Sequence, residues 1–150
     1  MLITEQQFQQ LRTIASGASP AQINGLLSLS GALNILNGLP YKNNIQNQLA
    51  AHIASNNFSD PNYTADQFNK DAIKIVATEF STYLQGRPES ARFNDLKAAS
   101  NAISSTLDPA QKAQLNTFIQ TIDAAGPPLQ TALGNVVAQN PNFMTGLVDN

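Results

Sequence analysis

Apolar residues recur along the chain every three or four positions, the spacing that places side chains on one face of an α-helix. The longest such stripe runs through residues 65–85 and is followed by Gly86 and Pro88, which end helices. Further stripes predict helices at residues 4–16, 19–39, 42–55, 89–106, 109–125 and 129–139. No stretch alternates apolar and polar residues, so we expect no β-strand. The sequence predicts an all-α fold, a compact single-domain bundle of six to seven helices with short loops, spanning residues 1–150.

The helix at residues 19–39 differs from the others because apolar residues cover nearly its whole circumference. It lies in a run from Thr13 to Tyr41 that contains no charged residue. A helix of this kind belongs in the middle of a packed protein or in a membrane. Asparagines interrupt it, and it lacks the roughly 20 consecutive apolar residues that a bilayer requires. We therefore expect a central core helix, either continuous or broken near Ser30 and Gly31, and no membrane insertion.

Four helix starts share one local pattern, in which a Ser, Thr or Asp precedes a Gln by three positions. The four are residues 4–7, 19–22, 64–67 and 108–111. In a capping box, the first side chain accepts from a backbone N–H of the first turn, and the Gln side chain bonds back to the capping residue. Pro20 and Pro109 occupy the first helical position, where a missing N–H is harmless. We expect a helix to start at each of these four places.

The amino-acid composition of the chain limits the kinds of molecule that it is expected to bind. Charged residues make up 12% of the chain, about half the usual share, while Asn and Gln number 17 and 14. A net charge of −2 with 8 Lys and Arg argues against nucleic-acid binding and against attraction to anionic membranes. The absence of cysteine excludes disulfides and thiolate chemistry. Residues 1–7 hold an acid and no base, so we expect no secretory signal peptide and either a cytoplasmic location or export by a route that needs none.

Two residues are candidates for catalysis. His52, the one histidine, lies on the apolar stripe of residues 42–55, and the sequence places neither nucleophile nor acid beside it. We interpret it as a core-edge residue with one hydrogen bond. Glu79 lies beside the inward stripe of the longest helix, where a carboxyl group among apolar neighbours could act as a general acid, as in helical muramidases. No motif supplies the second carboxylate, so a boundary glutamate facing solvent is the favoured interpretation.

The sequence contains no convincing motif for a metal site or a cofactor site. Residues 60–71 imitate a calcium loop, but Ala65 stands where that loop needs glycine, and Asp71 replaces the final glutamate. The glycines at positions 25, 31 and 38 lack the ending of a phosphate loop. We expect no metal site and no cofactor.

Four aromatic residues fall in predicted loops or near a terminus, beside Pro and Asn: Tyr41, Phe58, Tyr63 and Phe143. Aromatic side chains in such places can anchor a protein partner, and they can equally cover the end of a neighbouring helix. We expect Phe143 and Leu147 to form a last turn against the body of the protein.

The expected function is non-enzymatic protein–protein interaction, as an adaptor or effector-type module of bacterial or viral kind. A surface low in charge and rich in amides and hydroxyls suits contact through hydrogen bonds with little desolvation of charge. One alternative is a muramidase-like glycoside hydrolase that uses Glu79. Another is a structural or assembly subunit, or one domain of a longer polypeptide.

Overall fold

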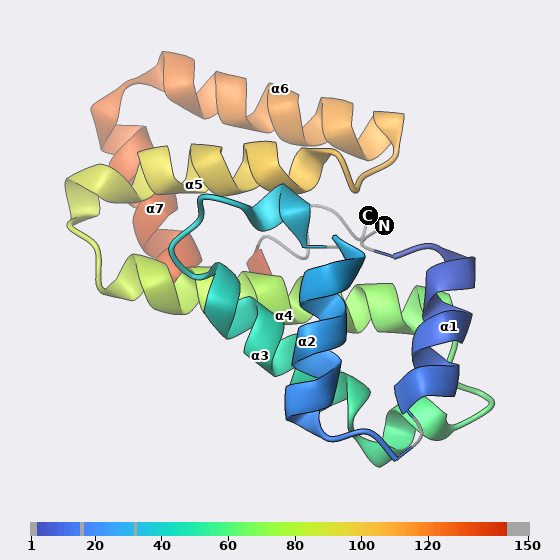
Figure 1. Ribbon diagram of the computed structural model, residues 1–150. Coiled ribbons are helices and arrows are strands. Elements are labelled where there is room, and N and C mark those ends of the chain that lie inside the picture. Colours follow the sequence, from blue (N-terminus) through green and yellow to red (C-terminus); the bar gives the residue numbers. More distant parts are fainter. Residues whose placement is uncertain (1–2, 16, 32, 144–150) are drawn as a thin grey trace. The chain divides into compact units, whose positions relative to one another are not determined.

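A computed structural model describes residues 3–15, 17–31 and 33–143. Over these residues the chain forms seven α-helices, two short 3-10 helices and no strand, which confirms the predicted all-α fold (Figure 1). The helices are α1 (Glu5–Ala15), α2 (Pro20–Ser30), α3 (Lys42–Ile53), α4 (Ala65–Gln85), α5 (Glu89–Ser104), α6 (Pro109–Ala125) and α7 (Pro127–Gln139). The 3-10 helices are η1 (Asn34–Leu36) and η2 (Asn56–Ser59). None of the helices in the described ranges is long and apolar enough to span a bilayer.

Backbone contacts divide the chain into two compact units, the first up to Ile75 and the second from Val76 onward. The boundary falls inside α4, which contributes its first half to one unit and its second half to the other. The prediction of a single domain stays a prediction. We describe the two units separately.

The helix starts agree closely with the sequence pattern. Three of the predicted capping boxes are complete, at Thr4–Gln7, Ser19–Gln22 and Asp108–Gln111. At the fourth, the backbone N–H of Gln67 donates to Thr64 Oγ1 over 3.1 Å, but the Gln67 amide donates instead to the Asp71 carboxylate over 3.0 Å. Only one of the two bonds of this capping box therefore forms, and the Gln67 side chain bonds one turn further along α4 instead. Helix α7 begins at Pro127, two residues before the predicted start, because proline fits the first turn of a helix.

The apolar segment at residues 19–39 is not a central core helix, and that prediction is wrong. Helix α2 ends at Ser30, where Gly31 adopts a left-handed conformation with φ 71°. Of the residues in α2 only Ile23 and Leu27 are buried, and Leu29 exposes 87% of its surface. The alternative of a break near Ser30 and Gly31 is confirmed. Helix α2 packs on α3 and leaves an apolar face uncovered.

Aromatic rings build the core of the first unit. Phe8 from α1, Phe58 from η2 and Phe68 from α4 are buried, with ring centroids 5.2 to 6.0 Å apart. Two of these ring pairs meet edge to face, an arrangement that stabilises aromatic pairs beyond the area they bury. Residues distant in sequence thereby hold α1, η2 and α4 together.

A buried amide ties the beginning of the first unit to α4. The Asn69 side chain is 7% exposed; its Oδ1 accepts from the Ile3 backbone N–H and its Nδ2 donates to the Ile3 carbonyl, both over 3.1 Å. The same Nδ2 donates to the Ala65 carbonyl over 2.9 Å. Asn69 therefore satisfies both backbone polar groups of Ile3 where α4 would otherwise bury them unpaired.

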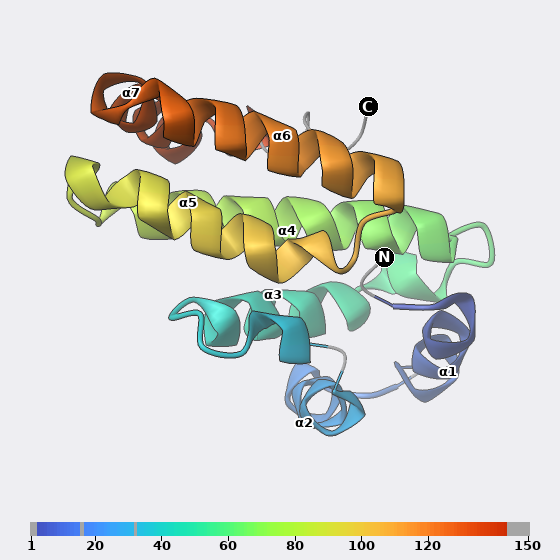
Figure 2. The same cartoon turned by 90° about the horizontal axis from the view of Figure 1, so that it is seen from above.

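The second unit is a bundle of α5, α6, α7 and the second half of α4, with α5 and α6 side by side in both ribbon views (Figures 1 and 2). Helices α5 and α7 approach closely at Gly134, where an added Cβ would lie 2.7 Å from the Cβ of Arg92. The Arg92 guanidinium donates to Asn135 Oδ1 over 2.7 Å and to the Leu84 carbonyl over 2.9 Å. This arginine joins three helices and is not part of an open basic face.

Replacing Asn69 by Ala should lower the free energy of unfolding by about 2–3 kcal/mol, because the Ile3 N–H and carbonyl would lose their partner in a buried place. Chemical denaturation followed by circular dichroism measures this loss. Asn43→Ala, at an exposed position on α3, is the control and should change stability by less than about 0.5 kcal/mol. Equal effects from the two variants would contradict the role given to Asn69.

Gly134→Ala and Gly25→Ala should have opposite effects, although both replace a helical glycine. Alanine is the better helix former, so Gly25→Ala, where the new Cβ meets nothing within 4 Å, should stabilise by about 0.5–1 kcal/mol. At Gly134 the clash with Arg92 should outweigh this gain and destabilise by about 1 kcal/mol or more. Thermal unfolding of both variants checks the signs, and a stabilised Gly134→Ala would rule out the close contact between α5 and α7.

Candidate functional site

Two adjoining hollows open between α1 and α2, both inside the first unit. The first has a volume of about 360 Å³ and the second about 570 Å³. Ile14, Leu26 and Leu29 line both. The first is completed by Ile3, Gln7, Gln10, Leu11 and Ser30, and the second by Gly17, Ala18, Gln22 and Gly25. We call the residues of these two sets together the α1–α2 surface.

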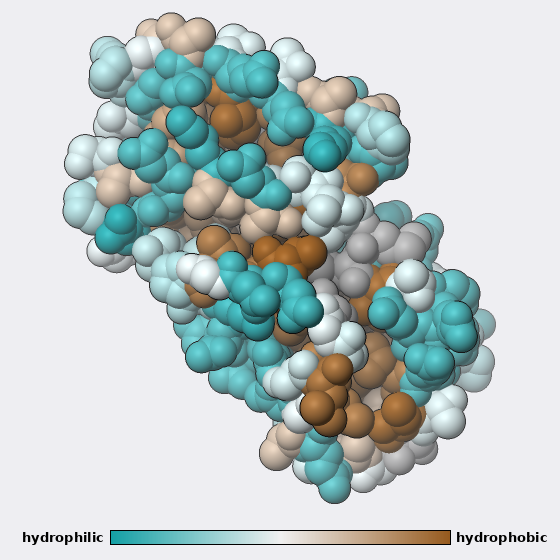
Figure 3. All heavy atoms as spheres, turned by 45° about the horizontal axis from the view of Figure 1, so that its top comes forward, coloured by the Kyte–Doolittle hydropathy of each residue, from teal (hydrophilic) through white to brown (hydrophobic). Residues whose placement is uncertain are grey.

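The α1–α2 surface is apolar and carries projecting side chains. Leu29 exposes 87% and Ile14 47% of its surface, although both are large and aliphatic. In Figure 3 apolar atoms gather over α1 and α2, in the lower right of the view. Exposed apolar side chains that gather in one patch, rather than lying scattered, mark places where another molecule binds.

Local structure explains why this surface stays open. Phe8 turns one face of α1 into the aromatic core, and Asn69 holds Ile3 at the beginning of α1 against α4. On α2, Ile23 and Leu27 are buried, whereas Leu26 is half-buried and Leu29 is exposed, and both of these line the hollows. The last residue of α1, Ala15, and the first of α2, Pro20, are close in sequence, and faces of both helices border the same hollows.

The electrostatics of the α1–α2 surface are neutral. None of its residues carries a charge. The nearest cation in sequence, Arg12, lies over the Phe8 ring, 4.6 Å from its centroid, and donates to the carbonyls of Asp60 and Tyr63. This arginine serves the fold of the first unit and adds no anion-binding group to the hollows.

A polar cluster in the first unit joins α3, the loop before α4, and α4 itself. His52 on α3 lies with its Nε2 2.7 Å from the Tyr63 hydroxyl, and that hydroxyl donates to Asp71 Oδ2 on α4 over 2.5 Å. Because the tyrosine has a single proton and gives it to the carboxylate, its oxygen accepts from Nε2–H of His52. Asp71 Oδ2 is also 3.5 Å from His52 Nε2. The prediction of a core-edge histidine with one hydrogen bond to a neighbour is confirmed.

This cluster is poorly suited to catalysis. Burial, together with the hydrogen bond and the negative charge of Asp71, raises the pKa of the Tyr63 hydroxyl well above its ordinary value. Such a tyrosine is a weak acid and seldom a phenolate, so it supplies neither a base nor a nucleophile near neutral pH. The Nε2 of His52 is a donor in this arrangement and has no lone pair to take a proton. The cluster fastens α3 and the loop before α4 to α4.

The four aromatic candidates are largely used inside the protein. Phe58 is 1% exposed, enclosed by the rings of Phe8, Phe68 and Tyr63, so its side chain offers no surface to a partner. Tyr41 is 4% exposed at the residue before α3. Tyr63 is half-buried in the polar cluster.

Phe143 is also half-buried, with its ring 6.3 Å from that of Phe118 on α6. Its ring contact with α6 agrees with the expected last turn, and its role as a contact residue stays a prediction. Leu147, the other residue of that turn, lies outside the described residues.

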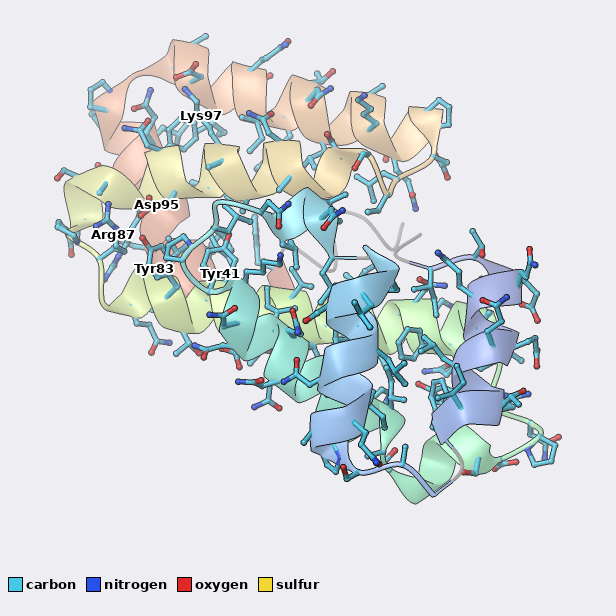
Figure 4. The ribbon with its side chains drawn as sticks, in the orientation of Figure 1. Tyr41, Tyr83, Arg87, Asp95 and Lys97 are labelled. Carbon is cyan, nitrogen blue, oxygen red and sulfur yellow. The ribbon has the colours of Figure 1, made fainter. Side chains whose placement is uncertain are left out.

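Arg87 and Lys97 form ion pairs, and Glu79 lies outside both hollows. Figure 4 shows Arg87 directed toward Asp95 on α5, and Nε lies 2.8 Å from the carboxylate, which raises the pKa of Arg87. Lys97 lies 3.4 Å from Asp123 and 5.5 Å from the centre of the Phe93 ring. Glu79 is half-buried on α4 and lines neither hollow.

The calcium-like loop is used as ordinary structure. Asp60 Oδ1 accepts from the Asn62 backbone N–H over 2.9 Å, Thr64 caps α4, and Asp71 belongs to the polar cluster. In the part of the chain that the structure describes, no group of three or more His, Cys, Asp and Glu side chains is placed to hold a metal ion.

No protein-family model, curated protein or solved structure matches this chain. Sequence reasoning overlooked Ile14 and Leu29, which the structure exposes together. The one available signal was the absence of charge from Thr13 to Tyr41, which we interpreted as burial.

Tyr63→Phe should lower the free energy of unfolding by about 1–2 kcal/mol at neutral pH, because the hydroxyl bonds to His52 and Asp71 are lost. The raised pKa of Tyr63 adds a pH dependence. Below pH about 10 the hydroxyl is protonated in both folded and unfolded chains, so its contribution is complete. Above that value the unfolded chain loses the proton first and the contribution declines.

The measurement is the difference in urea midpoint between wild type and Tyr63→Phe at several pH values. Other tyrosines and lysines titrate equally in both proteins and cancel. We expect the difference to narrow as the pH rises above about 10. A difference that is constant with pH would show that Tyr63 is not held in its protonated form by the fold.

Proposed function

We propose that this protein is a non-enzymatic protein-interaction module and that the α1–α2 surface is its contact site. The observation that carries the proposal is Leu29, 87% exposed on a helix without charge and bordering both hollows. A soluble chain gains nothing in its own fold from such a side chain, whereas burying it against a partner contributes about 2 kcal/mol.

The chemistry of the α1–α2 surface also indicates its preferred partner. Its centre is aliphatic, through Leu11, Ile14, Leu26 and Leu29, and its rim is made of Gln and Ser side chains. Interfaces commonly combine an apolar centre with a polar, hydrogen-bonding rim. A protein segment that presents aliphatic side chains among neutral polar ones fits this pattern, and a strongly charged ligand finds no opposite charge here.

The hydrolase alternative has less support. Glu79 borders neither hollow, and in the polar cluster His52 Nε2 and Asp71 Oδ2 are both bonded to the Tyr63 hydroxyl. The assembly alternative is compatible with the same α1–α2 surface, since an assembly also requires an exposed apolar contact.

The proposal predicts that Leu29→Gln abolishes capture of a partner and leaves the fold intact. Gln has a helix propensity similar to that of Leu, and an exposed position tolerates it. Immobilised wild type and variant are compared for proteins retained from lysate of the source cells, quantified by mass spectrometry. We expect the specific partner to be retained at least about tenfold less by the variant, as for a lost apolar anchor of about 1.4 kcal/mol or more.

Leu129→Gln is the matched control, because Leu129 on α7 exposes 46% of its surface and lies outside the α1–α2 surface. It should retain the partner as wild type does. Circular dichroism of both variants checks that the helices are kept. A partner lost equally from both variants, or from neither, would place the contact elsewhere and refute the proposal.

A further inference from the structure

The α1–α2 surface has a projection and a recess side by side. Leu29 projects, with 87% of its surface exposed, and the hollows of about 360 and 570 Å³ border it. A two-fold symmetric interface needs this combination, since the same patch of both subunits must supply the inserted group and the place that receives it. We propose that a second copy of this chain occupies the α1–α2 surface, with Leu29 of each copy seated in a hollow of the other.

The absence of charge on the α1–α2 surface is compatible with a second copy as its partner. Near a two-fold axis, residues of one subunit face the same residues of the other, so a charged group would meet like charge. No residue of the α1–α2 surface is charged, and the run from Thr13 to Tyr41 contains no charge at all. Arg12, at the edge of that run, is directed to the carbonyls of Asp60 and Tyr63. Self-association therefore meets no electrostatic penalty here.

The polar residues of the α1–α2 surface can also form hydrogen bonds with the same residues of a second copy. Gln7 and Gln22 use their side-chain oxygens to accept from backbone N–H groups in the capping boxes, which leaves their amide NH2 groups as donors. Gln10 brings a further acceptor and donor. Donors and acceptors are thus present on the same rim, so two identical rims can pair.

This inference rests on the proposed function, because it names the partner of the same surface. Its first test is sedimentation velocity of the full chain from micromolar to millimolar concentration. Wild type and Leu129→Gln should show a concentration-dependent shift from monomer to dimer. Leu29→Gln should raise the dissociation constant of the dimer at least about tenfold. The substitution removes two apolar contacts from each dimer, because each copy inserts one Leu29.

The second test uses the absence of cysteine, since any introduced thiol is the only one in the chain. Ser30→Cys, on the α1–α2 surface, should give a covalent dimer with a short bismaleimide reagent. Ala98→Cys, at an exposed position on α5, is the control and should give much less. Adding Leu29→Gln to Ser30→Cys should suppress the cross-link.

The outcomes separate this inference from the proposed function. A wild type that stays monomeric at every concentration overturns the second copy as partner. If that monomer still captures another protein through Leu29, the interaction-module proposal stands. A dimer that Leu29→Gln leaves unchanged also overturns the inference, because it forms through another surface. A dimer weakened by Leu29→Gln and cross-linked through Ser30→Cys supports it.

Discussion

The bidentate pairing of Asn69 with Ile3 is the interaction on which the first unit depends. It joins residues 66 positions apart through two hydrogen bonds at a buried place. It holds Ile3, just before α1, against α4, while Phe8 of α1 lies in the aromatic core. Ile3 also lines the first hollow of the α1–α2 surface. A single buried amide thus connects the packing of α4 to the shape of the candidate contact site, since an unpaired backbone group there would destabilise the whole arrangement.

Charged residues are scarce in this protein, and its three arginines are engaged in contacts within the protein. Arg12 donates to backbone carbonyls, Arg92 bonds to carbonyls and to Asn135, and Arg87 pairs with Asp95. These cations position helices and loops, so they are engaged before any ligand arrives. Under the proposed function, recognition would depend on the exposed aliphatic side chains and the amides of the α1–α2 surface. Such a surface gains binding energy mainly from apolar burial, with specificity from shape and hydrogen bonds.

Much of the local structure was predictable because it depends on neighbours in sequence. Helices α4 and α6 have the predicted bounds, and three capping boxes formed as expected, since a cap and its Gln are only three residues apart. The fourth box shows the limit of local reasoning. The Gln67 amide bonds to Asp71, which the Tyr63 hydroxyl and His52 also approach, and that grouping involves the fold of α3 against α4.

The sequence by itself determined that the chain is helical and where its helices start, because periodicity and capping are local properties. Only the tertiary structure decided which apolar faces are covered. Periodicity shows that a face is apolar but carries no record of what packs against it. Helix α2, apolar nearly all round, was therefore predicted to be central, yet Leu29 is exposed, while Phe58 in a predicted loop is buried among other rings. Burial depends on contacts between residues far apart in the chain.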